Sequence, residues 1–185
     1  MSKAAANSRL GGEIRRILAD KRGLAATEFA LIAPFMIALW LGAAELTQAI
    51  TIDRKVSHAS SALADLVTQQ TNLTNEQVED IMDATVAILS PYDTNNLTIE
   101  MAGVWIDEDG ATEVEWGVSR RGSAPSRGSS YAIPDSLIIP ETFLVVAQLS
   151  YAHTPVTTSV ITGPIQLQDE FFLRPRRSAD ITCCN

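Results

Sequence analysis

Residues 23–44 read GLAATEFALIAPFMIALWLGAA, and this stretch decides how the chain is organised. The 16 residues of 29–44 carry no charge. As a helix they would cover about 24 Å, slightly less than the ~30 Å hydrocarbon core of a bilayer. Extending the helix back to Leu24 reaches spanning length and takes in Thr27 and Glu28. The stretch therefore predicts a transmembrane helix.

Three residues within and after the apolar run agree with that prediction. Pro34 would kink a soluble helix, but transmembrane helices tolerate proline. Trp40, near the far end of the run, suits a membrane–water interface. Glu45 is the first charged residue after the run. We predict that residues 24–52 form the membrane helix.

Charge is unequally distributed about this helix. Residues 1–23 hold six Lys and Arg against two Asp and Glu, a net charge of +4, while the whole chain has −8 and the remainder therefore −12. Lys21 and Arg22 directly precede the helix, and the next basic residue is Arg54. Because cytoplasmic flanks are enriched in Lys and Arg, residues 1–23 are expected to form a cytoplasmic basic leader at the inner membrane, with 53–185 in the periplasm. The acidic body argues against a nucleic-acid partner.

Three fates are open to the apolar segment. It could remain as an uncleaved anchor. It could be a secretory signal peptide, with an apolar region at 29–41 and a small-residue cleavage site at 42–44, before Glu45. It could also follow a prepilin-type leader that is cut before the helix, so that the helix stays on the mature protein.

The residues that favour the third fate lie at the cytoplasmic edge. Gly23 ends the basic leader, and Glu28 and Phe29 are the fifth and sixth residues when Leu24 is the first. A lone carboxylate at the edge of an apolar run is costly to insert and requires a partner. A free α-amine at Leu24 of a neighbouring subunit would supply one, whereas a position in the headgroup layer would require none.

This segment resembles the TadE-like pseudopilins of the tight-adherence (Tad) pilus system. Their N-terminal pattern is a glycine, small residues, Glu-Phe-Ala-Leu, a proline and a later glutamate. The corresponding residues of this chain are Arg22, Gly23, Leu24, Ala25, Ala26, Thr27, Glu28, Phe29, Ala30, Leu31, Ile32, Ala33 and Pro34, followed by Gly42 and Glu45. The resemblance is strong over residues 22–54. It is weaker near the end of the chain, at Tyr151, Pro155 and 173–178.

The resemblance implies a processing site and an assembly role. A prepilin peptidase would cut between Gly23 and Leu24, and Glu28, beside Phe29, would be the acid used in processing or assembly. The expected partners are the inner membrane, other pilin-like subunits, the prepilin peptidase and the Tad assembly platform. The chain would then be a non-enzymatic minor pilin of a pilus and secretion apparatus that contributes to adhesion.

The rest of the chain predicts a small α+β domain. Apolar residues at helical spacing continue the membrane helix as a stalk to about Gln70. Thr74 and Gln77 form a capping box for a helix that ends at Ser90. Alternating apolar residues over 97–101 and at 114, 116 and 118 flank an Asp-Gly turn, and predict a hairpin. Residues 119–136 read as a mobile loop or a contact surface, 142–151 as a central strand, and 171–173 as an edge strand. Helices on one face of an antiparallel sheet are therefore expected, as in pilins.

No catalytic constellation accompanies these elements. The two histidines, His58 and His153, lack the partners of a known hydrolase motif, so no catalytic residue, metal or cofactor is expected and an anchored hydrolase is a weak alternative. Cys183 and Cys184 are the only cysteines. They belong either to a frayed tail or to a vicinal or intermolecular disulfide in an oxidising compartment.

Overall fold

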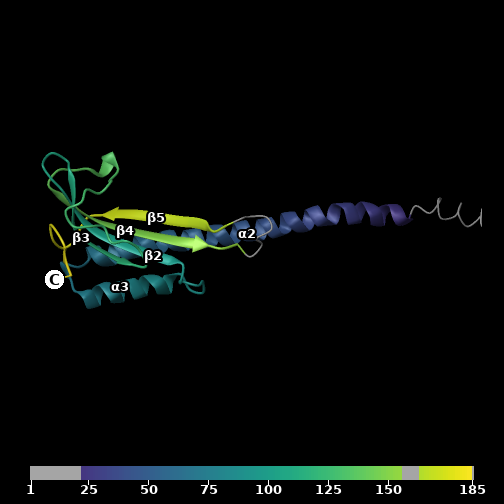
Figure 1. Ribbon diagram of the computed structural model, residues 1–185, viewed down its shortest axis with the longest axis horizontal. Coiled ribbons are helices and arrows are strands. Elements are labelled where there is room, and N and C mark those ends of the chain that lie inside the picture. The colour runs from purple at the N-terminus through teal and green to yellow at the C-terminus, as the bar shows by residue number, and fades with distance from the viewer. Residues whose placement is uncertain (1–21, 156–162, 185) are drawn as a thin grey trace, which may run out of the picture. The chain divides into compact units, whose positions relative to one another are not determined.

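The structure is a computed structural model that describes residues 22–155 and 163–184. The basic leader lies almost wholly outside these residues. The elements are α2 (Arg22–Thr68), β1 (Asn72–Leu73), α3 (Asn75–Ile88), β2 (Leu97–Ile106), β3 (Thr112–Arg120), a 3₁₀ turn η1 (Asp135–Leu137), β4 (Thr142–His153), β5 (Ile165–Leu173) and β6 (Thr182–Cys183). The expected α+β class, with an apolar N-terminal helix that continues as a stalk, is confirmed (Figure 1).

The chain divides into two compact units, Met1–Ala44 and Glu45–Asn185, and α2 contributes to both. In the second unit α2 turns one face towards the sheet. This face consists of small and branched residues at spacings of three and four: Ala49, Ile52, Val56, Ala59, Leu63, Ala64 and Val67. The side chain of Ser60 is fully buried among them and donates to the carbonyls of Ala147 and Asp169, at 3.4 and 3.1 Å. The helix thus lies close against β4 and β5.

Four antiparallel strands form the main sheet, in the order β3-β2-β4-β5. Leu97 pairs with Tyr151 and Ile106 with Thr142, so β2 and β4 are aligned along their whole length. The predicted central strand is confirmed as β4, since β2 and β5 cover both its edges and most of its side chains are buried. The predicted edge strand is β5, and it begins earlier than expected, at Ile165.

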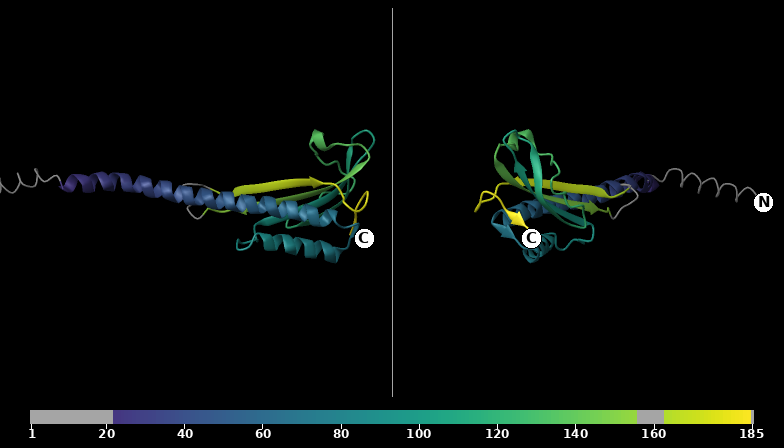
Figure 2. Two further views of the ribbon diagram at one scale, coloured as in Figure 1. Left: turned by 180° about the vertical axis from the view of Figure 1, so that it is seen from behind. Right: turned by 60° about the vertical axis from the view of Figure 1, so that its left-hand side comes forward.

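Helices α2 and α3 cover one face of the sheet, as Figure 2 shows. The predicted capping box is present at the start of α3: Gln77 N donates to Thr74 Oγ1 at 3.3 Å, and Thr74 N donates to Gln77 Oε1 at 2.9 Å. At the other end of α3, Lys55 of α2 donates to the carbonyl of Ser90 at 2.5 Å. A basic group at the C-terminal end of a helix satisfies carbonyls that lack a partner within the helix.

The long connection between β3 and β4 covers part of the opposite face of the sheet. Ile133 of this loop is buried against Val104, Val114 and Val146, and further apolar residues of the loop pack around them. Tyr131 fixes the loop to β5, because its hydroxyl donates to Glu170 Oε1 at 2.6 Å. This part of the loop therefore packs on the core, and the expectation of a contact surface over 119–136 stays a prediction.

A β-bulge interrupts the pairing of β2 with β3. Gly103 pairs with Trp116, whereas the next residue, Val104, pairs with Val114, so Glu115 is the extra residue of β3. A bulge of this kind reverses the side-chain alternation of its strand. Val114 consequently packs beneath the loop and Trp116 on the helix-covered face. The regular alternation expected for 114, 116 and 118 was wrong on this point.

Candidate functional site

The first candidate surface is the part of α2 in the N-terminal compact unit. Its large apolar side chains are exposed, with Leu24 at 60 %, Phe29 at 73 % and Trp40 at 70 %. Among the described residues, one helix is long and apolar enough to cross a membrane, and this is the helix. Such continuous apolar exposure is unfavourable in water, and a bilayer or the apolar faces of partner helices remove the cost.

The residues predicted for processing and assembly all lie on this exposed part of α2. Gly23 and Leu24 are in its first turn, and Thr27 stabilises that turn by donating to their carbonyls at 3.2 and 2.8 Å. Glu28 and Phe29 follow in the next turn, where both are exposed. Pro34 lies inside the continuous helix. The roles assigned to these residues stay predictions.

The environment of α2 changes at Glu45, the first residue of the second compact unit. Its side chain is buried, with 7 % exposed, and Ala49 and Ile52 are buried beyond it. His153, at the end of β4, is also buried. Its Nε2 atom has no hydrogen-bond partner among the described residues. The end of the membrane helix at residue 52 stays a prediction.

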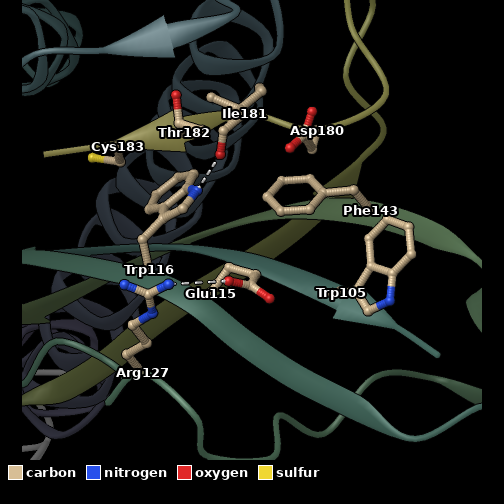
Figure 3. A pocket seen from close by; sticks show the side chains of 9 residues that line it. All are labelled: Trp105, Glu115, Trp116, Arg127, Phe143, Asp180, Ile181, Thr182 and Cys183. Atoms are coloured by element: carbon tan, nitrogen blue, oxygen red, sulfur yellow. Dashed lines mark hydrogen bonds and ion pairs between the residues drawn. The ribbon is translucent and has the colours of Figure 1, made fainter. Parts of the chain in front are cut away.

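The second candidate site is an open cavity of about 250 Å³ in the C-terminal unit (Figure 3). Strands β2, β3 and β4, the β3–β4 loop and the C-terminal segment line it, with Trp105, Glu115, Trp116, Arg127, Phe143, Asp180, Ile181, Thr182 and Cys183. The lining thus includes two carboxylates, one guanidinium and three aromatic rings. Arg127 Nη2 lies 3.6 Å from Glu115 Oε2, and its side chain is 79 % exposed.

The β-bulge and Gly103 position residues that line this cavity. The bulge places Glu115 and Trp116 at its wall, and Phe143 reaches it from β4. A Cβ atom on Gly103 would lie 2.3 Å from Trp116 Nε1 and 2.4 Å from Phe143 Cζ, so both rings pack directly on the glycine backbone. Trp116 Nε1 donates to the carbonyl of Ile181 at 2.6 Å, which fixes its ring against the C-terminal segment.

The C-terminal segment forms one wall of the cavity and is held at several points. Arg176 pairs with Asp65 of α2 at 2.6 Å, and its backbone N–H donates to the carbonyl of Thr68 at 3.0 Å. Ile181 is almost fully buried, and β6 pairs in parallel with β1. The structure joins Cys183 and Cys184 in a disulfide at this point. The tail is therefore a docked element of the second unit.

Sequence reasoning did not find the cavity. Trp116 was assigned only to the alternation of a strand, and Glu115, Arg127 and Asp180 were assigned to nothing. The available signal was Gly103, since a glycine inside a strand often marks a bulge or a close approach of neighbouring groups. Which side chains of β3 line the cavity depends on how β3 pairs with β2, and the local sequence of β3 does not reveal this pairing.

The comparisons with known proteins concern the first candidate surface. Residues 23–65 match the family model described as TadE-like protein. No curated protein matches the chain, and no solved structure does. The match begins at Gly23 and covers the exposed apolar part of α2 and most of its buried part. TadE-like proteins are structural proteins of Tad pilus systems, where they act with other pilus components. Over residues 23–65 the expected resemblance to the TadE-like family is confirmed.

Proposed function

We propose that the chain is a minor pilin, or pseudopilin, of a Tad-type pilus and secretion apparatus, and that it assists pilus assembly or initiation and so surface adhesion. The observation that carries this proposal is the change along α2. Its first part exposes an apolar surface, and the same helix enters the core of a folded domain from Glu45 onwards. The same helix therefore supplies both the proposed anchor and part of the domain core.

The proposed topology places the basic leader in the cytoplasm, one helix across the inner membrane, and the α+β domain in the periplasm. The segment 23–44 would extend about 33 Å as a helix, enough for a ~30 Å hydrocarbon core. The charge difference between leader and body supports this orientation. Association with pilin-like subunits and with the assembly platform would use the apolar face of the helix, and the chain itself would make or break no covalent bond.

Processing at the Gly23–Leu24 bond by a prepilin peptidase is part of the proposal. Cleavage would free the α-amine of Leu24, and the Glu28 carboxylate of a neighbouring subunit would pair with it. A charge pair in the membrane avoids the cost of an isolated carboxylate there. The exposed position of Glu28, beside Phe29 on the first turns of α2, leaves it accessible to another helix.

One alternative has an observation in its favour. A signal peptidase that cuts before Glu45 would separate the two compact units at their boundary and release an exported soluble domain. The other alternative is an unprocessed, membrane-tethered periplasmic scaffold or binding protein. It differs from the proposal in keeping an uncut N-terminus and in its role.

Substitution of Gly23 tests the processing step without disturbing the fold. A Cβ on Gly23 would meet nothing within 4 Å, and the same is true of Gly42, which provides a matched control. We expect Gly23→Val to abolish shortening of the chain in its native host and Gly42→Ala to leave it intact, as judged by migration on a denaturing gel. Normal shortening of Gly23→Val would contradict the proposed cut.

Deletion of the gene tests the proposed role in pilus assembly. We expect the deletion to reduce surface fibres and adhesion. The wild-type gene should restore both, and the Gly23→Val variant should not. Normal fibres and adhesion in the deletion strain would overturn the assembly role, although the topology would stand.

A further inference from the structure

We infer that the cavity beside the β-bulge is a socket for one basic side chain, a lysine or arginine, presented by a partner protein subunit. This deepens the proposed function and rests on it for the nature of the partner. The socket itself rests on the residues at the cavity: the carboxylates of Glu115 and Asp180, and the rings of Trp105, Trp116 and Phe143.

The size of the cavity favours a single side chain. Its volume of about 250 Å³ is below the range of roughly 300–1,000 Å³ that is usual for pockets that enclose small-molecule ligands. An extended lysine side chain, with five heavy atoms, or an arginine side chain, with seven, needs less room than such a ligand. Because the cavity is open at the surface of the domain, an occupant can remain attached to a second protein.

The chemistry of the walls favours a cation. Aromatic rings attract ammonium and guanidinium groups, and the rings also provide apolar contact for the methylene stem. Figure 3 shows the Trp116 and Phe143 rings side by side, with Glu115 below them and Trp105 beyond Phe143. The indole N–H of Trp116 already donates to Ile181, so it is not available to a neutral hydroxyl acceptor such as a saccharide.

A cation of the chain itself, the guanidinium of Arg127, already lies at this site. The guanidinium of Arg127 lies at the mouth of the cavity, 3.6 Å from Glu115, which is beyond hydrogen-bond distance. With 79 % of its side chain exposed, Arg127 is held weakly and a second cation can displace it. The net charge of −12 on the residues after 23 further attracts a basic partner.

The test uses the full chain in phospholipid nanodiscs, with the indole nitrogens of its three tryptophans labelled with ¹⁵N. The probe is Nα-acetyl-lysine methylamide. The control probe is the norleucine analogue, which has the same stem without the charge, and methyl α-glucoside serves as a saccharide probe. We expect the lysine probe to shift the Trp105 and Trp116 resonances in a saturable manner and to leave Trp40 unchanged. Neither control probe should do so.

Three variants distinguish a socket from a nonspecific acidic surface. Glu115→Gln should weaken binding of the lysine probe by about threefold to fivefold, the range of an exposed ion pair. Arg127→Ala should tighten it, because the competing cation is gone. Glu113→Gln, an exposed neighbour on the same strand, should leave it unchanged.

Several outcomes would overturn the proposal: no saturable shift with lysine, an equal shift with norleucine, a saturable shift with the glucoside alone, or no tightening in Arg127→Ala. These results are independent of the processing of the N-terminus. A chain that binds lysine but is never cut would therefore refute the pilin proposal alone, and a processed chain that does not bind would refute the socket alone.

Discussion

The rings of Trp116 and Phe143 pack on the backbone of Gly103. Both rings occupy the space that a Cβ on this residue would need. Both rings are buried, so neither can move aside easily. We expect Gly103→Ala to lower the free energy of unfolding by about 1–3 kcal/mol, the usual cost of overpacking a core. Chemical unfolding of the full chain in micelles, followed by far-UV circular dichroism, measures this. Gly42→Ala, which meets open space, is the control, and equal stability of the two variants would refute the account of the bulge.

Tyr131 links stability to pH. Burial, and then the hydrogen bond to Glu170, raise the pKa of Tyr131 above its ordinary value of 10.0. Because the folded state holds the phenolic proton more tightly than the unfolded state, this contribution is complete below about pH 10 and is lost as the pH rises above it. Tyr131→Phe should therefore be less stable than the wild type at pH 8, and the difference should narrow by pH 11. Unfolding curves at both pH values test this, and a constant or widening difference would contradict it.

At the scale of elements, the capping box stabilises the start of α3 through hydrogen bonds between Thr74 and Gln77. Thr74→Ala removes the acceptor of the Gln77 N–H and should destabilise the domain by about 1 kcal/mol. Thr71→Ala is the control, because Thr71 is exposed in the preceding turn and should change the stability by less than about 0.5 kcal/mol. Thermal unfolding of both variants gives the comparison. A Thr74→Ala variant as stable as the control would mean that packing of α3 alone fixes the start of the helix.

Elements with local signals could be predicted from the sequence. The capping box at Thr74 and the Asp-Gly turn, where Gly110 has a φ of +82°, depend on residues within a few positions of each other. The central position of β4 followed from its nearly continuous apolar composition. The long apolar helix α2 followed from composition.

Elements that depend on distant partners could not be predicted. The bulge at Glu115 is decided by its pairing with Gly103 on another strand, and the alternation of β3 gave no sign of it. The docked tail depends on Asp65 and Trp116, which lie far from it in the sequence, and no periodicity marks its buried residue, Ile181. The bulge and the docked tail both line the cavity, so the cavity could be found only once both were known.

At the scale of the whole molecule, α2 has two environments along one continuous helix. Ile37 lies in the exposed apolar part, where an aspartate would cost about 2.5–3.5 kcal/mol in the centre of a bilayer. Ile37→Asp should therefore release a large fraction of the chain from membranes during alkaline carbonate extraction. His58→Asp, at an exposed position of the same helix within the folded domain, should remain membrane-bound. Equal retention of both variants would argue against a membrane span at this segment.

The N-terminal residue of the mature protein tests the central claim most directly. The chain would be purified from membranes of its native host, with and without the prepilin peptidase, and its N-terminus determined by mass spectrometry. The account predicts Leu24 when the peptidase is present and the uncut leader when it is absent. A mature chain that begins at Met1 or Ser2 in both strains, or at Glu45, would contradict it.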